Sequence, residues 1–180
     1  MKTIGVFDSG VGGKSVANAI TKALTDAKVV YVDDKENVPY GNKTPDELLQ
    51  LVEPILNKLS KDCDVIVVAC NTVSTTIIND LRERITVPLI AMEPMVKPAA
   101  ERTKTKVVAV CATPTTLASK RYNWLKDTYA TGVRVVEPDC SDWSQMIEAN
   151  QVDRQKVENR IQEALVQNAD VIVLGCTHYH

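Results

Sequence analysis

Residues 64–72 read Asp-Val-Ile-Val-Val-Ala-Cys-Asn-Thr, and residues 170–178 read Asp-Val-Ile-Val-Leu-Gly-Cys-Thr-His. Each stretch joins an acidic residue, a run of β-branched and aliphatic residues, a small residue and a cysteine. Short apolar runs bounded by polar residues predict strands that are buried on both faces of a parallel sheet. In an open α/β sheet, ligands usually bind just past the carboxyl ends of such strands. The repeat therefore predicts two equivalent strand ends, one carrying Cys70 and the other Cys176.

The composition is that of an ordinary globular chain. Of the 180 residues, 44% are hydrophobic and 24% are charged, which is enough for one large or two small hydrophobic cores. The formal net charge is −2 and no basic tract stands out, so we expect no nucleic-acid partner. No apolar run approaches the length of a membrane-spanning helix, so we expect no membrane partner.

The N-terminus and the cysteines both bear on the cellular compartment. The first ten residues run directly into a predicted strand and a glycine loop, without the apolar region of a secretory signal. The five cysteines are odd in number and lie mostly in apolar runs, which is typical of reduced thiols. We therefore expect a cytoplasmic protein.

A glycine-rich segment follows the first predicted strand, at residues 3–7. Residues 8–15 read Asp-Ser-Gly-Val-Gly-Gly-Lys-Ser and precede a predicted helix. Glycines let a backbone turn sharply and approach a ligand, and a loop at a helix N-terminus favours an anion. However, the glycine spacing fits neither nucleotide-binding fingerprint, and Asp8 would repel a phosphate. Nucleotide binding is therefore disfavoured.

Local signals predict the other elements of the first half. Thr44 is expected to be a helix N-cap, with Pro45 at the first helical position and Glu47 completing a capping box. The remaining segments are strands at residues 28–32 and 87–91 and a turn at residues 38–42.

A helix is also predicted directly after Cys70, with Ile77, Ile78 and Leu81 buried. A cysteine just ahead of a helix N-terminus is a position where the helix dipole and free amides favour the thiolate. The alternative is a buried structural thiol, which is the commoner fate of a free cysteine.

The second half of the chain echoes the first. Strands are predicted at residues 106–113, 133–137 and 170–174, a helix carries Leu117, Tyr122 and Leu125, and Asp153 caps a further helix whose apolar residues are Val157, Ile161, Ala164 and Leu165. Two copies of a β-α-β-α-β unit predict an α/β fold of two pseudo-symmetric parallel-sheet domains that face one cleft. We place the division near residue 95, giving a first domain of residues 1–95 and a second of residues 96–180.

Two thiols on opposite sides of one cleft suit the inversion of a tetrahedral carbon by two bases. One thiolate would remove a proton while the other thiol returns one from the opposite face. Asp8 and His178 are the neighbours expected to handle protons.

Each of these residues also has a plainer interpretation. Asp8 can be a helix cap, Tyr40 a packed turn aromatic, Glu148 a solvated carboxylate and His178 an exposed, inert side chain. A metal site formed by Cys70, Cys176 and His178 is a further alternative, but a fourth ligand and a Cys-x-x-Cys pair are missing from the sequence.

The chain resembles the cofactor-independent glutamate racemases of the aspartate/glutamate racemase family. The matching motifs span nearly the whole chain in the family's order: Ile-Gly-Val-Phe-Asp-Ser-Gly-Val-Gly-Gly at 4–13, Val-Pro-Tyr-Gly at 38–41, Ala-Cys-Asn-Thr at 69–72, Glu-Pro at 93–94 with Lys-Pro-Ala at 97–99, and Leu-Gly-Cys-Thr-His-Tyr at 174–179. The opening and cysteine motifs together are highly specific. The resemblance implies interconversion of L- and D-glutamate for peptidoglycan, without pyridoxal phosphate, another cofactor or a metal.

The resemblance also implies roles for individual residues. Cys70, assisted by Asp8, would act on D-glutamate, and Cys176, assisted by His178, would act on L-glutamate. Glu148, eight residues after Cys140 as in the family, would support the histidine side. The remaining implied residues would hold the substrate's carboxylates and ammonium: Ser9, Tyr40, Gly41, Asn71, Thr72, Thr113, Thr116 and Thr177.

The family's sequences continue past the Cys-Thr-His-Tyr motif with a segment that returns to the first domain, whereas this chain ends at His180, where the family usually has proline. A shortened, weakly active or inactive relative that binds an acidic amino acid or a protein partner is therefore an alternative, as is an aspartate racemase. We expect a homodimer, in which a second subunit covers the open sheet edge.

Overall fold

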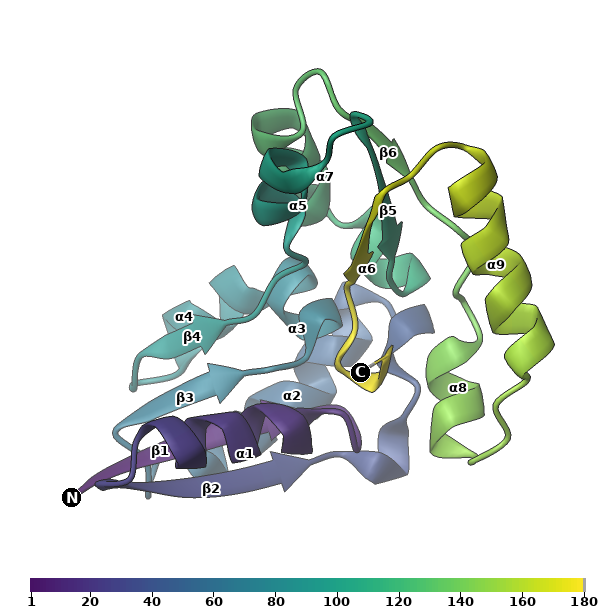
Figure 1. Cartoon of the computed structure of the whole chain (residues 1–180). Helices are drawn as coiled ribbons and strands as arrows, with labels where there is room; N and C mark the ends of the chain where they lie inside the picture. Colours follow the sequence, from purple (N-terminus) through teal and green to yellow (C-terminus); the bar gives the residue numbers. More distant parts are fainter. Residues whose placement is uncertain (180) are drawn as a thin grey trace.

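The computed structural model describes residues 1–179, whose backbone forms two α/β domains, each built on a parallel sheet (Figure 1). The first sheet has the strand order β2-β1-β3-β4 and the second has the order β6-β5-β7. The strands are β1 (Lys2–Asp8), β2 (Ala27–Asp33), β3 (Val65–Val68), β4 (Leu89–Ala91), β5 (Val107–Cys111), β6 (Arg134–Val136) and β7 (Val171–Leu174). The second sheet thus repeats the order of the first three strands of the first sheet, as the sequence repeat predicts. The division near residue 95 stays a prediction.

Helices connect the strands and cover the sheets. In the first domain they are α1 (Gly13–Ala23), α2 (Pro45–Leu59), α3 (Asn71–Thr76) and α4 (Ile78–Arg84), with short 3₁₀ turns η1 (Lys35–Asn37) and η2 (Tyr40–Asn42). From residue 96 onward they are α5 (Val96–Arg102), α6 (Pro114–Ala118), α7 (Lys120–Tyr129), α8 (Trp143–Glu148) and α9 (Arg154–Val166), followed by the turn η3 (Thr177–Tyr179). Within residues 1–179 the helices are too short or too polar to cross a membrane.

The central strands carry the hydrophobic cores because their side chains point alternately to the two faces of a sheet. In β3, Ile66 and Val68 pack into the cluster that includes the buried side chains of α2, such as Leu56. Val67, between them, packs on the other face with Ala17 of α1. β3 is therefore buried on both faces, as its β-branched sequence predicts.

The start of α2 shows how local sequence fixes a helix boundary. The Thr44 hydroxyl accepts the N–H of Glu47 at 3.3 Å, and the Glu47 carboxylate accepts the N–H of Thr44 at 2.7 Å. Pro45 occupies the first helical position, where its missing N–H costs nothing. The predicted capping box is confirmed.

The prediction that both cysteine-bearing strands are buried on both faces is wrong for β7. This strand lies at an edge of its sheet, and the side chains of Ile172 and Leu174 are 37% and 38% exposed. Its composition resembles that of β3, but burial depends on what covers a strand, which a short apolar run does not encode.

Two predicted helices are each divided in two. The helix after Cys70 is interrupted at Ile77, which has φ −127° and ψ 10° and separates α3 from α4. The helix expected to carry Leu117, Tyr122 and Leu125 is interrupted at Ser119, whose hydroxyl accepts the N–H of Tyr122 and so begins α7.

The helix predicted after Asp153 forms as α9, with the Asp153 side chain accepting the N–H of Lys156. Its apolar face is narrower than predicted, because Leu165 is 47% exposed while Ala164 is buried. Alanine has a small side chain, and this allows α9 to lie close to the second sheet, where Ala164 packs with Val107 and Ala109.

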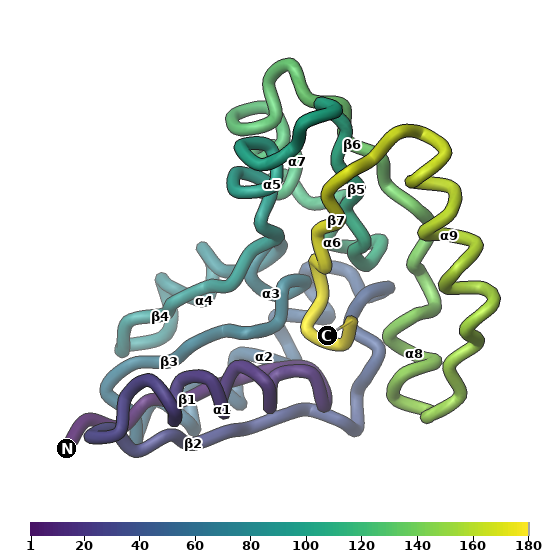
Figure 2. The backbone as a smooth tube through the Cα atoms, viewed as in Figure 1, coloured from purple at the N-terminus to yellow at the C-terminus, as the bar shows by residue number. Residues whose placement is uncertain are grey.

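Residues 175–179, which follow β7, contact the first domain, where the Thr177 hydroxyl donates to Asp8. Figure 2 shows the segment after β7 descending beside the turn that precedes α1. In a parallel sheet the carboxyl ends of all strands lie along the same side of the sheet. In this structure the carboxyl-terminal sides of the two sheets face each other. The ends of β1, β3, β5 and β7 therefore surround one region between the domains.

Candidate active site

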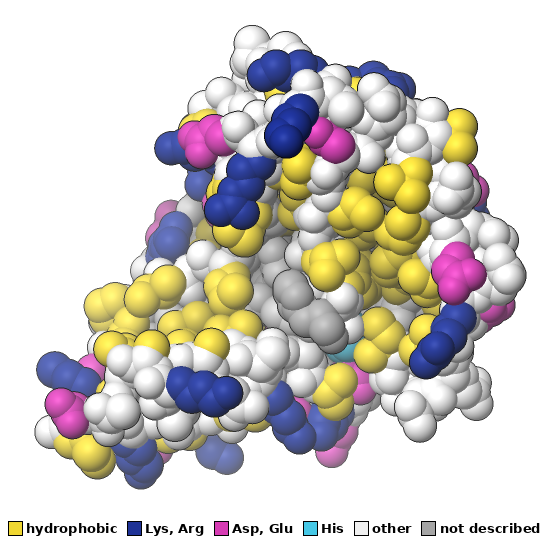
Figure 3. Space-filling view, in the orientation of Figure 1, with side chains coloured by type: hydrophobic (Ala, Val, Ile, Leu, Met, Phe, Trp, Pro, Cys, Tyr) yellow, Lys and Arg dark blue, Asp and Glu magenta, His cyan; other side chains and the backbone are white. Residues whose placement is uncertain are grey.

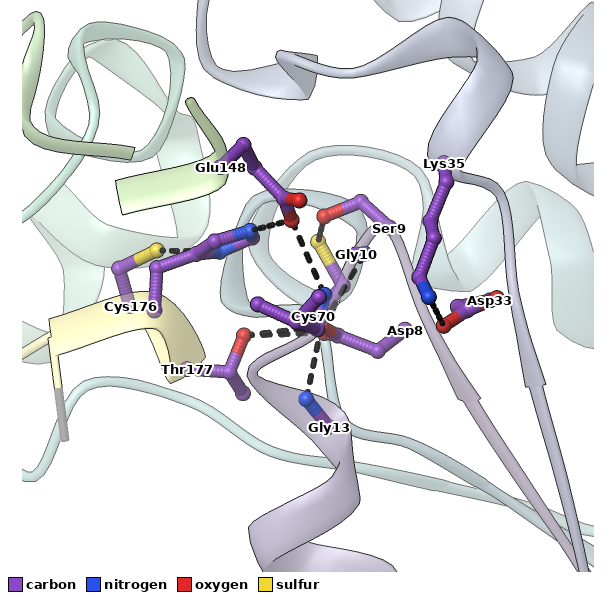
Figure 4. Close-up of polar contacts among 12 residues, drawn as sticks. Asp8, Ser9, Gly10, Gly13, Asp33, Lys35, Cys70, Glu148, Cys176 and Thr177 are labelled. Atoms are coloured by element: carbon purple, nitrogen blue, oxygen red, sulfur yellow. Dashed lines mark hydrogen bonds and ion pairs between the residues drawn. The ribbon is translucent and has the colours of Figure 1, made fainter. Parts of the chain in front are cut away.

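A cavity of about 210 Å³ lies between the two domains, at the carboxyl ends of their central strands. Nine of the residues predicted for the site contribute to its wall: Ser9, Tyr40, Gly41, Cys70, Thr72, Thr113, Glu148, Cys176 and His178. The two cysteines come from different domains and line the same cavity, which is the arrangement that the sequence repeat predicts. Figure 4 shows the Cys70 sulfur next to Ser9 of the glycine loop and the Cys176 sulfur farther from the loop.

Cys70 lies between β3 and α3, where it is the N-cap residue of the helix. Its Sγ atom is 3.5 Å from the Ser9 hydroxyl, and its side chain is almost fully buried. Burial raises the pKa of the Cys70 thiol to about 11, and the charge of Asp8 adds to the increase. The Ser9 hydroxyl and the amides of α3 act in the opposite direction, as predicted from the helix N-terminus, but desolvation outweighs them. Cys70 is therefore a thiol at neutral pH.

Cys176 begins the turn after β7 and is connected to a chain of polar groups. Its Sγ is 3.5 Å from Nδ1 of His178, and Nε2 of His178 is 2.6 Å from Oε1 of Glu148. A carboxylate can only accept a hydrogen bond, so Nε2 carries the hydrogen and Nδ1 is free to exchange a proton with the sulfur. Burial raises the pKa of the Cys176 thiol well above its ordinary value.

Asp8 lies at the end of β1, beneath the glycine loop. Its Oδ2 accepts the N–H groups of Gly10 at 3.3 Å and Gly13 at 3.0 Å, and the Thr177 hydroxyl donates to both of its oxygens at 3.0 and 3.1 Å. Burial raises the pKa of the Asp8 carboxyl, although the positive charge of His178, when its ring is protonated, and these hydrogen bonds oppose the rise. The side chain hydrogen-bonded to Cys70 is Ser9, so the assistance of Asp8 to Cys70 stays a prediction.

The opposite wall of the cavity presents a group of hydroxyls. Thr72 and Thr113, one from each domain, lie 2.9 Å apart, and Thr116 contacts both. Thr115 donates to the carbonyl oxygen of Gly41 at 2.7 Å, which fixes the turn η2 against α6. Hydroxyls and backbone amides of this kind can bind carboxylates without introducing a competing base.

Four predicted residues lie outside the cavity wall. Thr116 hydrogen-bonds to Thr72 and Thr113, and Thr177 donates to Asp8. Asp8 and Asn71 are buried behind the wall. The wall contains five residues that the sequence interpretation missed: Val38, Pro39, Ser144, Gln145 and Ala149. Ser144 and Gln145 share one face of α8 with Glu148, and Ala149 directly follows the helix. Helical spacing therefore links these three residues to Glu148, but it does not show that this face reaches the cavity.

The metal-site alternative receives no support from the part of the chain that the structure describes. Within residues 1–179, no three His, Cys, Asp or Glu side chains come close enough to share a metal ion. His180, which stands where the family usually has proline, lies outside the described residues.

Comparison with known proteins agrees with this geometry. The sequence profile of the Asp/Glu/Hydantoin racemase family matches residues 4–180. Glutamate racemase from Pseudomonas entomophila is 41% identical over 182 residues, which cover 98% of this chain and 69% of the relative. The glutamate racemase of Roseiflexus is 38% identical, with 99% of this chain and 68% of the relative covered.

Solved structures give the same result. The Escherichia coli glutamate racemase, solved with L-glutamate and the activator UDP-MurNAc-ala, superimposes with a TM-score of 0.89 at 31% identity, covering 99% of this chain and 70% of that one. The chain thus spans about 70% of the length of the relatives it matches. With the cysteine-bearing strand ends, the cavity between the domains and these similarities in agreement, the chain belongs to the Asp/Glu/Hydantoin racemase family.

Proposed function

We propose that this chain is a glutamate racemase, which interconverts L- and D-glutamate without pyridoxal phosphate. One observation carries the proposal: a buried thiol from each domain lines the same small cavity. A substrate bound between Cys70 and Cys176 would present its α-carbon to two acid–base groups. The relatives compared above, which are named glutamate racemases, support the choice of substrate.

The reaction moves one proton off the α-carbon and another onto it. With D-glutamate, the Cys70 thiolate takes the α-hydrogen as a proton, and the electron pair of the broken C–H bond stays on the α-carbon. The Cys176 thiol then donates its proton to the opposite face of that carbon and becomes the thiolate. Reaction from L-glutamate runs the same steps in reverse, so each thiol serves as base in one direction and as acid in the other.

The polar neighbours of the cysteines fit these roles. His178 is placed to accept a proton from Cys176 through Nδ1, and Glu148 stabilises the positive charge that the imidazole then carries. Ser9 is placed to donate a hydrogen bond to the Cys70 thiolate. Asp8 acts on Cys70 through its charge, which raises the thiol pKa and so disfavours the thiolate until substrate binds.

The negative charge of the substrate requires hydrogen-bond donors. Ser9, Thr72 and Thr113 supply hydroxyls at the cavity wall, and the N-terminus of α3 supplies amides. We propose that these groups hold the two carboxylates, while Tyr40, whose hydroxyl donates to Asp34 at 2.6 Å, fixes the side of the cavity formed by η2.

We further propose that the enzyme works in the cytoplasm and supplies D-glutamate for peptidoglycan, and hence for cell-wall formation and cell shape. Its partner in the reaction is a small molecule. The net charge of −2 gives no support for a nucleic-acid partner.

Deuterium incorporation tests the proposed activity directly. The purified chain is incubated with L-glutamate, and separately with D-glutamate, in D₂O. We expect the α-proton signal to disappear from the ¹H NMR spectrum of each enantiomer while the optical activity falls to zero, because both bases exchange with solvent. The same assay with L-aspartate measures discrimination between the two acids, which one methylene separates.

Two results would contradict the proposal. Retention of the α-proton by both enantiomers in a folded protein would leave a binding role. Faster exchange of aspartate than of glutamate would instead indicate an aspartate racemase.

We also propose that the chain forms a homodimer. Hydrophobic side chains gather on the face where β4 and β7 lie (Figure 3), and Ile90, Met95, Ile172 and Leu174 are exposed on these edge strands and beside them. Exposed apolar patches of this kind commonly mark association surfaces. Light scattering should give twice the chain mass, and Ile172→Lys should give the chain mass. A wild-type protein that is monomeric over a wide concentration range would contradict the dimer.

A further inference from the structure

Residues 9–12, between β1 and α1, and Gly13, the first residue of α1, form a loop that lies in direct contact with the second domain. This segment is called the 9–13 loop. A methyl group added at Gly10 would come within 1.9 Å of Glu148 Oε1 and 2.7 Å of His178 Nε2. One added at Gly12 would come within 2.3 Å of the carbonyl carbon of Thr177. These distances are far below van der Waals contact, so a side chain at either position would displace the second domain's groups.

Backbone conformation does not explain the two glycines. Gly12 has φ −62° and ψ −34°, which is helical geometry open to every residue. Among the glycines of the described chain, a positive φ occurs at Gly132, far from this loop. Glycine at positions 10 and 12 is therefore required by the close approach of the second domain, and not by the turn that the sequence interpretation invoked.

The loop's amides also bind carboxylates of the protein itself. Val11 donates its N–H to Glu148 Oε1 at 2.9 Å, and the same oxygen accepts from His178 at 2.6 Å. Gly10 and Gly13 donate to Asp8, which in turn accepts from the Thr177 hydroxyl. Figure 4 shows these contacts converging on the loop from both domains. The anion-binding capacity expected of such a loop is therefore used within the protein.

We propose that the 9–13 loop is an interdomain latch, and that Gly10, Val11 and Gly12 are positioning residues for the Cys176 half of the site. The loop belongs to the first domain, whereas Glu148, His178 and Cys176 belong to the second. When the domains are together, the Val11 amide holds the Glu148 carboxylate in the orientation that fixes the His178 ring on Cys176. When they separate to admit substrate, Glu148 loses this amide and the ring loses its fixed partner.

The latch links closure of the cavity to the positioning of the His178 ring beside the Cys176 thiol. A glutamate side chain without a fixed partner samples several rotamers, and holding it in one costs conformational entropy. The Val11 hydrogen bond and the steric fit at Gly10 and Gly12 supply that restraint only in the closed arrangement. As a consequence, Cys176 is prepared for proton transfer only when the two domains are closed around the cavity. This inference rests on the proposed racemase function for its catalytic meaning, but its structural part can be tested alone.

The structural test uses NMR of the His178 ring. The chain has two histidines, so a His180→Gln background leaves His178 as the sole imidazole. The hydrogen bond from Nε2 to Glu148 should give a slowly exchanging, downfield N–H proton in ¹⁵N-labelled protein. We expect this signal to be lost in Gly12→Ala and in Gly10→Ala. It should persist in Thr21→Ala, a control change on the exposed face of α1, where the Thr21 hydroxyl donates to the Ala17 carbonyl of the same helix and not to the loop.

The functional test measures exchange against inversion for D-glutamate in D₂O. If the latch fails, Cys70 can still remove the α-proton and return a deuteron, but Cys176 is badly placed to donate from the opposite face. We expect the ratio of exchange to inversion to rise about tenfold in Gly12→Ala, and to stay at the wild-type value in Thr21→Ala. A purely structural role for Gly12 would lower both rates together.

A second pair of variants serves if the glycine variants do not fold. Thr177→Val keeps the side-chain volume but removes the hydrogen bond to Asp8, and Thr177→Ser keeps the hydroxyl. The first should weaken the N–H signal and raise the exchange ratio, and the second should restore both. Wild-type signals and ratios in Gly12→Ala, or in Thr177→Val, would overturn the latch. Absence of any exchange in the wild-type protein would overturn the racemase function instead, and the NMR comparison would still decide the latch.

Discussion

Replacing Cys70 by serine is expected to lower kcat/KM for glutamate racemisation by about 10³-fold, and replacing Cys176 is expected to do the same. A positioned acid–base group typically contributes roughly 10² to 10⁴-fold to a proton transfer. A serine hydroxyl has a far higher pKa than a thiol, so it is a much weaker acid and is essentially never present as the anion at neutral pH. The two cysteines should matter equally, because each step of inversion needs both.

Thermodynamics does not allow a variant to lose kcat/KM in only one of the two directions, L to D or D to L. L- and D-glutamate have the same free energy in water, so the equilibrium constant is one and kcat/KM must be equal in the two directions. The roles of the two thiols therefore have to be separated by exchange in D₂O. Cys70→Ser should leave slow exchange of L-glutamate through Cys176, and Cys176→Ser should leave slow exchange of D-glutamate through Cys70.

Cys63→Ser provides the matched control. Cys63 is buried in the core of the first domain beside Leu59 and lies outside the cavity wall. The same atomic change there should alter kcat/KM by less than about twofold, because core substitutions of similar volume act mainly on stability. Retention of a tenth or more of the wild-type kcat/KM in either Cys70→Ser or Cys176→Ser would contradict the two-thiol mechanism.

Local sequence signals predicted most of the fold. The β-branched runs gave β1, β3, β5 and β7, since such side chains favour extended backbone and bury well in a parallel sheet. The Thr44 capping box gave the start of α2, since its two hydrogen bonds involve residues only three apart. The similarity between residues 64–72 and 170–178 predicted that the chain forms two similar domains.

The errors lie where the structure depends on distant parts of the chain. β7 has the composition of a buried strand, but no local pattern records that its outer face is exposed. At Ile77 no residue type in the sequence indicates that the helix is interrupted. At Ser119 the sequence does indicate it, because serine is a preferred N-cap residue and here it caps α7.

In the candidate site, too, the features set by local sequence were predictable and those set by distant contacts were not. Cys70 and Cys176 were predictable because each ends a recognisable strand. The packing of α8 against the cavity, which brings Ser144, Gln145 and Ala149 to the wall, depends on contacts between the domains. The meaning of the glycine loop depends on the same contacts, since glycine gives one sequence signal for a sharp turn and for a close approach.

Racemisation is expected to accelerate about tenfold for each unit of pH between 6.5 and 8.5. The free-enzyme pKa of Cys70 is raised to about 11, and that of Cys176 is raised further, in both cases chiefly by burial. Below its pKa, a group loses its proton in a fraction that grows tenfold per pH unit, so about one Cys70 in 10⁴ is a thiolate at pH 7. Turnover needs one thiolate and one thiol, and the thiolate is the scarce form.

The pH window is chosen so that the fold does not change with the chemistry. A thiol whose pKa is higher in the folded than in the unfolded chain stabilises the fold fully below the unfolded value, near 9.0, and this stabilisation is lost as pH rises toward the folded value. Between pH 6.5 and 8.5 both states keep the proton, so stability should be nearly constant. A thermal melt at each pH checks this directly.

The informative quantity is kcat/KM, because it reports the ionisation of free enzyme, whereas kcat reports that of the substrate complex. We expect log kcat/KM to rise with a slope near +1, and we expect kcat to rise less steeply, since the substrate's ammonium group favours a nearby thiolate once it is bound. Cys63→Ser should follow the wild-type slope. A kcat/KM that is flat from pH 6.5 to 8.5 would mean that a thiolate already exists in the free enzyme. In that case the helix N-terminus and the Ser9 hydroxyl, and not burial, would dominate the ionisation of Cys70.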